Sequence, residues 1–131
     1  MRLALIASMI LAIGACTLPG SQVEDLPGLA GTYVANGVDP LGVEYSGTVI
    51  ITNGIDAGEY LVTWLVTGAV QEGVGRLAGN RFTVEWTTTH GGRGESRGTA
   101  NYVLGPDGSL IGERTVVGLD GSGTEEIYPR G

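Results

Sequence analysis

Apolar and polar residues alternate along most of the chain beyond residue 28, a pattern typical of half-buried β-strands. Short glycine-rich stretches separate eight segments that carry this alternation. The predicted strands are Gly31–Val38, Glu44–Thr52, Glu59–Thr67, Val70–Leu77, Arg81–Thr89, Arg97–Leu104, Ser109–Val117 and Gly123–Tyr128. Each connection is short enough for a hairpin and too short for a crossover helix. The sequence therefore predicts an all-β fold: an eight-stranded antiparallel up-and-down meander that forms a small closed or nearly closed barrel.

Glycines and tryptophans are predicted to share one face of this sheet. A two-residue turn at Gly79-Asn80 sets Gly73 opposite Trp86, and a turn at Gly68-Ala69 sets Gly73 opposite Trp64. The looser loops allow one more glycine beside each indole. The resulting row across five strands is Gly47, Trp64, Gly73, Trp86 and Gly98. Glycine beside an indole is one way to fit a bulky ring onto a strongly curved sheet.

The aromatic residues on this face have two interpretations. In the favoured one they fill the lumen, because the interior of an eight-stranded barrel is often just wide enough for side chains. In the other they line a cavity for a small apolar or aromatic ligand. The candidate lumen residues are Trp64, Trp86, Tyr45, Tyr60, Tyr102 and Gly73.

The last two hairpins suggest further contacts. The turn at Pro106-Asp107-Gly108 sets Tyr102 near Gly112 and Leu104 near Leu110. If Gly118 faces Gly121, Arg114 stands opposite Glu125. We expect this pair on the outer face, because charged residues are rarely fully buried. On the inner face it is a buried ion pair or a ligand contact.

The first residues of the chain read as an export signal. Arg2 precedes a short apolar run, Leu3 to Ala15, which is well under the ~20 residues needed to span a bilayer. The run ends in Ile13-Gly14-Ala15-Cys16, which resembles the lipobox of bacterial lipoproteins. That resemblance implies cleavage before Cys16 and a diacylglycerol on its thiol; ordinary signal cleavage nearby is the alternative.

Three regions follow from this reading. They are a signal peptide at residues 1–15, a lipidated Cys16 with a flexible tether at 16–28, and a β-barrel domain at 29–131. Thr17, rather than Asp, follows the cysteine, so the outer membrane is favoured within the bacterial cell envelope.

Composition narrows the chemistry. The chain has seven basic residues, all Arg, and fourteen acidic ones, for a formal net charge of −7. This sign argues against nucleic-acid binding and against attraction to anionic lipid headgroups. Without Lys, and with one His and one Cys, the chain lacks a Schiff base, a Cys/His dyad and a Cys/His zinc site. We expect no catalytic residue, no metal and no cofactor.

A polar stretch between two predicted strands is the candidate recognition loop. Its residues His90, Arg93, Glu95 and Arg97 include the only histidine. A solvated loop without a function is the alternative, although loops on rigid scaffolds often carry binding residues.

Several strand and turn motifs resemble those of known proteins. Gly31-Thr32-Tyr33, Tyr45-Ser46-Gly47-Thr48-Val49 and Pro106-Asp107-Gly108-Ser109-Leu110 resemble small exported bacterial proteins often labelled fibronectin-binding. That resemblance implies adhesion to a host matrix protein. Gly31-Thr32-Tyr33 also resembles the Gly-x-Trp opening of lipocalin-like (calycin) barrels, with Tyr in place of Trp. This second resemblance implies a barrel of the lipocalin/avidin-like architecture.

Together these observations predict a monomeric, lipid-anchored binding protein of the cell envelope that is not an enzyme. We expect its partner to be a protein or polymer, contacted through loops or the strand surface around a filled lumen. The alternatives are a calycin-like small-molecule carrier and an envelope inhibitor of a host or bacterial hydrolase.

Overall fold

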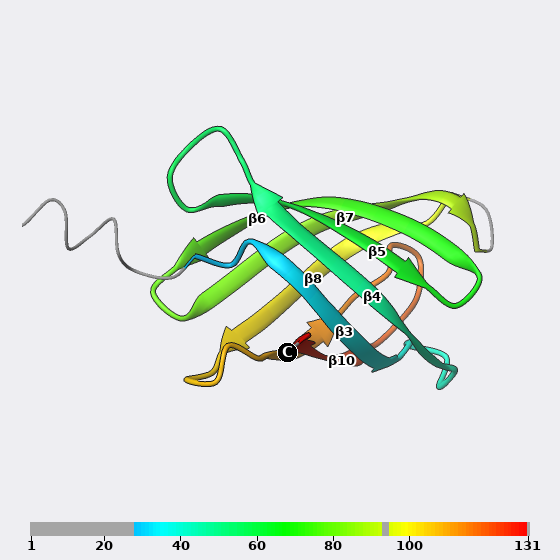
Figure 1. The fold of residues 1–131 in the computed structure, drawn as a ribbon. Helices are drawn as coiled ribbons and strands as arrows, with labels where there is room; N and C mark the ends of the chain where they lie inside the picture. The colour runs from blue at the N-terminus through cyan, green and yellow to red at the C-terminus, as the bar shows by residue number, and fades with distance from the viewer. Residues whose placement is uncertain (1–27, 93–94, 131) are drawn as a thin grey trace, which may run out of the picture.

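The computed structural model describes residues 28–92 and 95–130, which form a closed antiparallel β-barrel (Figure 1). With the strand labels of Figure 1, the order around the barrel is β10-β3-β4-β5-β6-β7-β8-β9, so each strand pairs with its neighbours in sequence and β10 closes on β3. The strands are β3 (Gly31–Val38), β4 (Glu44–Asn53), β5 (Glu59–Val66), β6 (Ala69–Ala78), β7 (Arg81–Gly91), β8 (Arg97–Leu104), β9 (Leu110–Arg114) and β10 (Gly123–Pro129). Within the described residues, no helix is long and apolar enough to cross a membrane.

The two ends of the barrel differ in their connections. Residues 39–43, 67–68 and 115–122 join strands at one end, on the right of Figure 1, where β7 ends and β8 begins. Residues 54–58, 79–80 and 105–109 join strands at the other end, where Gly28 to Ala30 lead into β3. The chain therefore enters the barrel at the end opposite the loops that follow β3, β5, β7 and β9.

Alternation along each strand places the apolar side chains inside. In β7, for example, Phe82, Val84 and Trp86 are buried while the residues between them are exposed. The fully buried interior is made mostly of apolar and aromatic side chains: Trp64, Tyr102, Phe82, Ile51, Leu110, Ile127, Val49, Val62 and Val84. Burial of this apolar surface is the main favourable contribution to folding of such a barrel.

The predicted fold class is confirmed, and the predicted strands agree with the observed ones to within one or two residues in all but one case. The exception is β9, predicted as Ser109–Val117 and observed as Leu110–Arg114. Beyond Arg114 the chain leaves β10 but stays beside β8, because the Thr115 N–H donates to the Thr99 carbonyl (2.8 Å) and the Val117 N–H to the Arg97 carbonyl (2.8 Å).

Some predicted strand registers are confirmed. Gly73 stands opposite Trp86 on β6 and β7, and Gly98 stands opposite the same indole on β8. Tyr102 faces Gly112, and Leu104 faces Leu110.

Two predicted registers around the tryptophans are wrong by two residues. Val62, and not Trp64, stands opposite Gly73, because the β5–β6 turn uses Thr67-Gly68 instead of Gly68-Ala69. Gly68 takes the left-handed conformation at the second turn position, with φ of 74°. Val49, and not Gly47, stands opposite Trp64. Only the Gly73, Trp86 and Gly98 part of the predicted glycine–indole row therefore exists.

Candidate functional site: a buried polar cluster beneath an end cup

Glu125 of β10 is the centre of a polar cluster inside the barrel. Its side chain is fully buried, and its carboxylate accepts four hydrogen bonds. The donors are the Tyr45 hydroxyl (2.8 Å), the Trp64 Nε1–H (3.2 Å), Arg114 Nη1 (3.2 Å) and the Tyr102 hydroxyl. A buried carboxylate is costly unless it is paired and hydrogen-bonded, and this one is both.

Arg114 of β9 is the partner of Glu125 and is almost as deeply buried, with 6% of its side chain exposed. Its guanidinium carbon lies 4.7 Å from the centroid of the Trp64 ring and 4.4 Å from that of the Trp86 ring. Both indoles therefore contribute cation–π attraction, which is strongest where the cation is desolvated. Arg114 Nη2 also donates to Gln71 Oε1 at 2.6 Å, and this bond ties β9 to β6 across the lumen.

The ion pair was expected on the outer face, with Arg114 directly opposite Glu125, and both expectations are wrong. Arg114 and Glu125 face the interior, and Arg114 stands opposite Gly123 while Glu125 stands opposite Gly112. Burial is tolerated because Tyr45, Trp64 and Tyr102 supply further donors to the carboxylate. Charged residues are rarely fully buried unless they are paired and hydrogen-bonded in this way.

Burial and charge shift the pKa of the groups in the cluster. Burial raises the pKa of the Tyr45 and Tyr102 phenols, and the Glu125 carboxylate raises both further. For Arg114, burial lowers the pKa, but the combined effect of Glu125, Tyr102 and Tyr45 outweighs it and leaves the pKa raised. The Tyr45 and Tyr102 phenols of the cluster are therefore neutral at neutral pH.

A cup opens above this cluster at the end of the barrel formed by the loops after β3, β5, β7 and β9. Its volume is about 490 Å³. Its floor contains Tyr45, Gln71, Trp86 and Arg114. Its wall and rim are mainly apolar and include Val38, Pro40, Leu41, Val43, Val66, Ala69, Val116, Val117 and Leu119. Three carboxylate residues, Asp39, Glu44 and Glu95, also line it.

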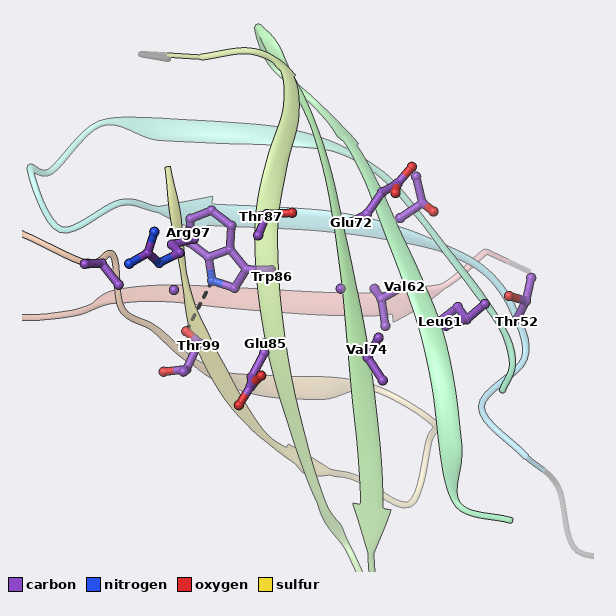
Figure 2. A pocket seen from close by; sticks show the side chains of 14 residues that line it. Thr52, Leu61, Val62, Glu72, Val74, Glu85, Trp86, Thr87, Arg97 and Thr99 are labelled. Atoms are coloured by element: carbon purple, nitrogen blue, oxygen red, sulfur yellow. Dashed lines mark hydrogen bonds between the residues drawn. The ribbon is translucent and has the colours of Figure 1, made fainter. Parts of the chain in front are cut away.

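A larger hollow of about 760 Å³, called the outer groove below, lies along the outer wall of β5 to β8 (Figure 2). It is bordered by the outward side chains of Leu61, Val74, Glu72, Glu85 and Arg97. Figure 2 also shows the Trp86 indole donating to the Thr99 carbonyl, at 3.3 Å. Most of the groove's border is exposed side chains, whereas the buried Arg114 and the half-buried Tyr45 and Gln71 converge on the floor of the cup. The cup is therefore the better candidate site.

The candidate lumen residues divide between the two ends of the barrel. Tyr45, Trp64, Trp86 and Tyr102 gather around the Arg114–Glu125 pair. Tyr60 instead lies toward the other end and packs edge-on against Phe82, with ring centroids 6.0 Å apart. Gly73 stands opposite Trp86, and an added Cβ at Gly73 would lie 2.5 Å from the Glu85 carbonyl oxygen.

The candidate loop residues are not brought together. His90 belongs to β7 and Arg97 to β8, and both are exposed, so the connection between them is shorter than predicted. Glu95 lines the cup, whereas Arg97 borders the outer groove. Arg93 and Cys16 lie outside the described residues.

Gln71 was not predicted, and Arg114 and Glu125 were expected as an outer-face pair, with a buried ion pair or a ligand contact as the alternative. A signal for Glu125 was present in the sequence, because Gly123, Glu125 and Ile127 alternate with outward residues in β10 and share the face of a buried isoleucine. The same argument places Arg114 with Leu110 in β9.

Comparisons with known proteins identify the fold. No family model and no curated protein matches the chain. A redesigned β-barrel, mFAP1 bound to DFHBI, is similar with a TM-score of 0.64 at 11% identity, covering 78% of this chain and 94% of that one. Another redesigned β-barrel gives a TM-score of 0.62 at 14% identity, covering 79% and 92%. A barrel from the de novo design of a fluorescence-activating β-barrel gives 0.58 at 18%, covering 77% and 93%. These likenesses support the barrel architecture, but none supports the expected relation to fibronectin-binding proteins.

Proposed function

We propose that this protein is a lipid-anchored binding protein of the bacterial cell envelope, without catalytic activity, that takes a small apolar molecule into the end cup. The observation that carries the proposal is the cup itself, a cavity of about 490 Å³ with an apolar wall and a polar floor in which Arg114 is buried. Sites for small molecules are commonly concave, mostly apolar, of this size, and equipped with a few convergent polar groups.

The packed interior limits how deep such a ligand reaches. Below the cup, Trp64 and Tyr102 are fully buried, and Phe82 and Ile127 fill the layers beneath. The ligand therefore lies at the mouth of the barrel, above the side chains of Trp86 and Arg114. This differs from a carrier that encloses its ligand in the centre of an open lumen.

The cup is also well placed for a protein tethered at its N-terminus. The chain enters the barrel at Gly28 and Leu29, at the end opposite the cup. A lipid on Cys16 would be separated from that end by about a dozen residues, which span at most roughly 40 Å when extended. The attachment point of such a tether is therefore at the opposite end of the barrel from the cup, and the tether leaves the cup uncovered.

Titration with the neutral apolar dye Nile red tests the site. We use the full chain carrying Cys16→Ser, so that no acyl chain competes for the cup. Val43→Ser and Leu119→Ser remove exposed apolar side chains from the rim and are expected to weaken dye binding several-fold. Leu61→Ser is the matched control, because Leu61 is similarly exposed (48%, against 50% for Val43) but borders the outer groove. Weakening by Leu61→Ser alone would place the site in the groove and overturn the proposal.

Adhesion to a protein is the second candidate function, and the apolar rim favours it. Leu41, Val43 and Val117 are 52%, 50% and 62% exposed, and they surround one opening. Exposed apolar side chains gathered in one place often mark protein contacts. Surface plasmon resonance on immobilised fibronectin, with Leu41→Ser and Val117→Ser as variants, tests this candidate. Binding that both variants leave unchanged would exclude the rim as the adhesive surface.

A further inference from the structure

We infer that the ligand of the cup is an uncharged molecule with a hydrogen-bond acceptor, such as an amide carbonyl, and that this acceptor enters first and bonds Arg114. The inference rests on the proposed function and specifies the chemical class of its ligand. It follows from the hydrogen-bonding capacity of the floor and from the charges around the cup.

The floor offers donors more than acceptors. A guanidinium carries five N–H donors, and within the described residues the Arg114 side chain uses its Nη1 for Glu125 and its Nη2 for Gln71. One lone pair of the Gln71 carbonyl accepts this second bond, and the Gln71 amide nitrogen donates to Thr88 Oγ1 at 3.3 Å. The Tyr45 hydroxyl already donates to Glu125. A ligand that reaches the floor therefore bonds best by accepting from Arg114.

The charges around the cup favour a neutral acceptor over an anionic one. The Arg114 charge is already balanced by Glu125, 3.2 Å away. The described residues that line the cup include three carboxylates, Asp39, Glu44 and Glu95, and Arg114 is their only basic residue. A carboxylate ligand would lose hydration and meet net negative charge. An ammonium group would be attracted by the three carboxylates, but at the floor it would meet the Arg114 charge and bring only donors to a floor that is itself rich in donors. An amide carbonyl accepts strongly, loses less hydration free energy than a carboxylate, and has no net charge to be repelled.

Three probes of one chain length test the inference: octanamide, octanoate and octylamine, each at pH 7.5 with the full-length Cys16→Ser chain. The chain has two tryptophans, so ¹H–¹⁵N spectra show two indole N–H signals, which Trp86→Phe assigns. Octanamide is expected to shift the Trp86 signal and the Arg114 Nε–H signal. Trp86 borders both the cup and the outer groove, whereas Arg114 lines the cup and not the groove, so the Arg114 shift assigns binding to the cup. It is also expected to bind about tenfold more tightly than octanoate, a difference of roughly 1.4 kcal/mol. Equal or tighter binding of octanoate or octylamine would overturn the inference.

Rim variants test the charge argument without touching the buried cluster. Glu44→Gln and Glu95→Gln change exposed side chains, so both should fold normally. Together they are expected to tighten octanoate binding several-fold relative to octanamide binding. Octanoate binding that does not respond would contradict the role of the rim charges. A shift of the Arg114 signal with octanoate but not with octanamide would contradict the role of the floor.

The outcomes separate this inference from the proposed function. If Nile red binds in the cup but octanoate is preferred, the site stands and only the ligand class is wrong. If neither Nile red nor any of the three amphiphiles changes the Trp86 signal, the proposed function itself fails.

Discussion

Arg114 and Glu125 form a buried ion pair across β9 and β10, although neither residue stands directly opposite the other. Arg114 pairs with Gly123 and Glu125 with Gly112, yet Nη1 and Oε2 are 3.2 Å apart. The two side chains share the inner face and meet on the diagonal, a spacing that long side chains can bridge in an antiparallel pair. The residue opposite each of them is a glycine, so no second side chain competes for the space between them.

Glu125→Gln is expected to destabilise the barrel by about 3–5 kcal/mol, because it leaves the Arg114 charge buried without its counter-charge. Urea unfolding followed by tryptophan fluorescence measures the change. Glu85→Gln, on the exposed face of β7, is the control and should change stability by less than about 0.5 kcal/mol. Similar effects from both variants would show that the pair has no special role.

Arg114→Met combined with Glu125→Gln is expected to cost less than the two single changes together. Removing both charges avoids the unpaired buried charge that each single variant creates. The coupling energy from a double-mutant cycle in urea measures this. Strictly additive effects would mean that the two charges do not stabilise each other.

The barrel is expected to lose stability as the pH rises above about 10. The pKa of Tyr45 and of Tyr102 is raised in the folded state, so the unfolded chain releases these protons first. Their contribution is fully present below the unfolded pKa and is lost as pH rises toward the folded pKa. Thermal unfolding from pH 8 to 11.5 measures the loss, and absorbance at 295 nm reports phenolate formation. Tyr102→Phe should reduce the dependence on pH above 10; an unchanged slope would contradict this assignment.

Gly98→Ala is expected to destabilise the barrel by about 1–3 kcal/mol through overpacking. An added Cβ there would collide with the Thr115 carbonyl and come within 3.0 Å of the Trp86 ring. Gly79→Ala is the contrasting variant, because nothing lies within 4 Å of its added Cβ and its cost comes from a φ of +62°. Only Gly98→Ala should move the Trp86 indole signal in ¹H–¹⁵N spectra. An unmoved signal would show that β8 has room for the methyl group.

Cys16→Ser is expected to prevent acylation and to release the protein from membranes. Fractionation of host cells, with metabolic labelling by a palmitate analogue, measures both effects. Thr17→Ser is a matched control that leaves the cysteine in place. Membrane association that persists in Cys16→Ser with normal processing would contradict the lipoprotein assignment.

Local sequence pattern predicted most of the fold. Alternation predicted the strands, and the inward face of β7 followed from Phe82, Val84 and Trp86. The β6–β7 register followed from the two-residue turn at Gly79-Asn80, because a short turn fixes which residues face each other. At the β5–β6 turn, a single glycine was compatible with either turn position, and the sequence did not decide between them. The looser β4–β5 loop left the position of Gly47 equally open.

What the sequence determined by itself was thus the meander: eight amphipathic strands, their inward faces and their tightest turns, all of which depend on neighbours in the chain. Only the tertiary structure decided the polar cluster. Glu125 accepts hydrogen bonds from Tyr45, 80 residues away, and from Trp64, 61 residues away, and these contacts exist because β10 closes on β3. Whether a charged residue can be buried depends on such partners, and closure of the barrel is what supplies them.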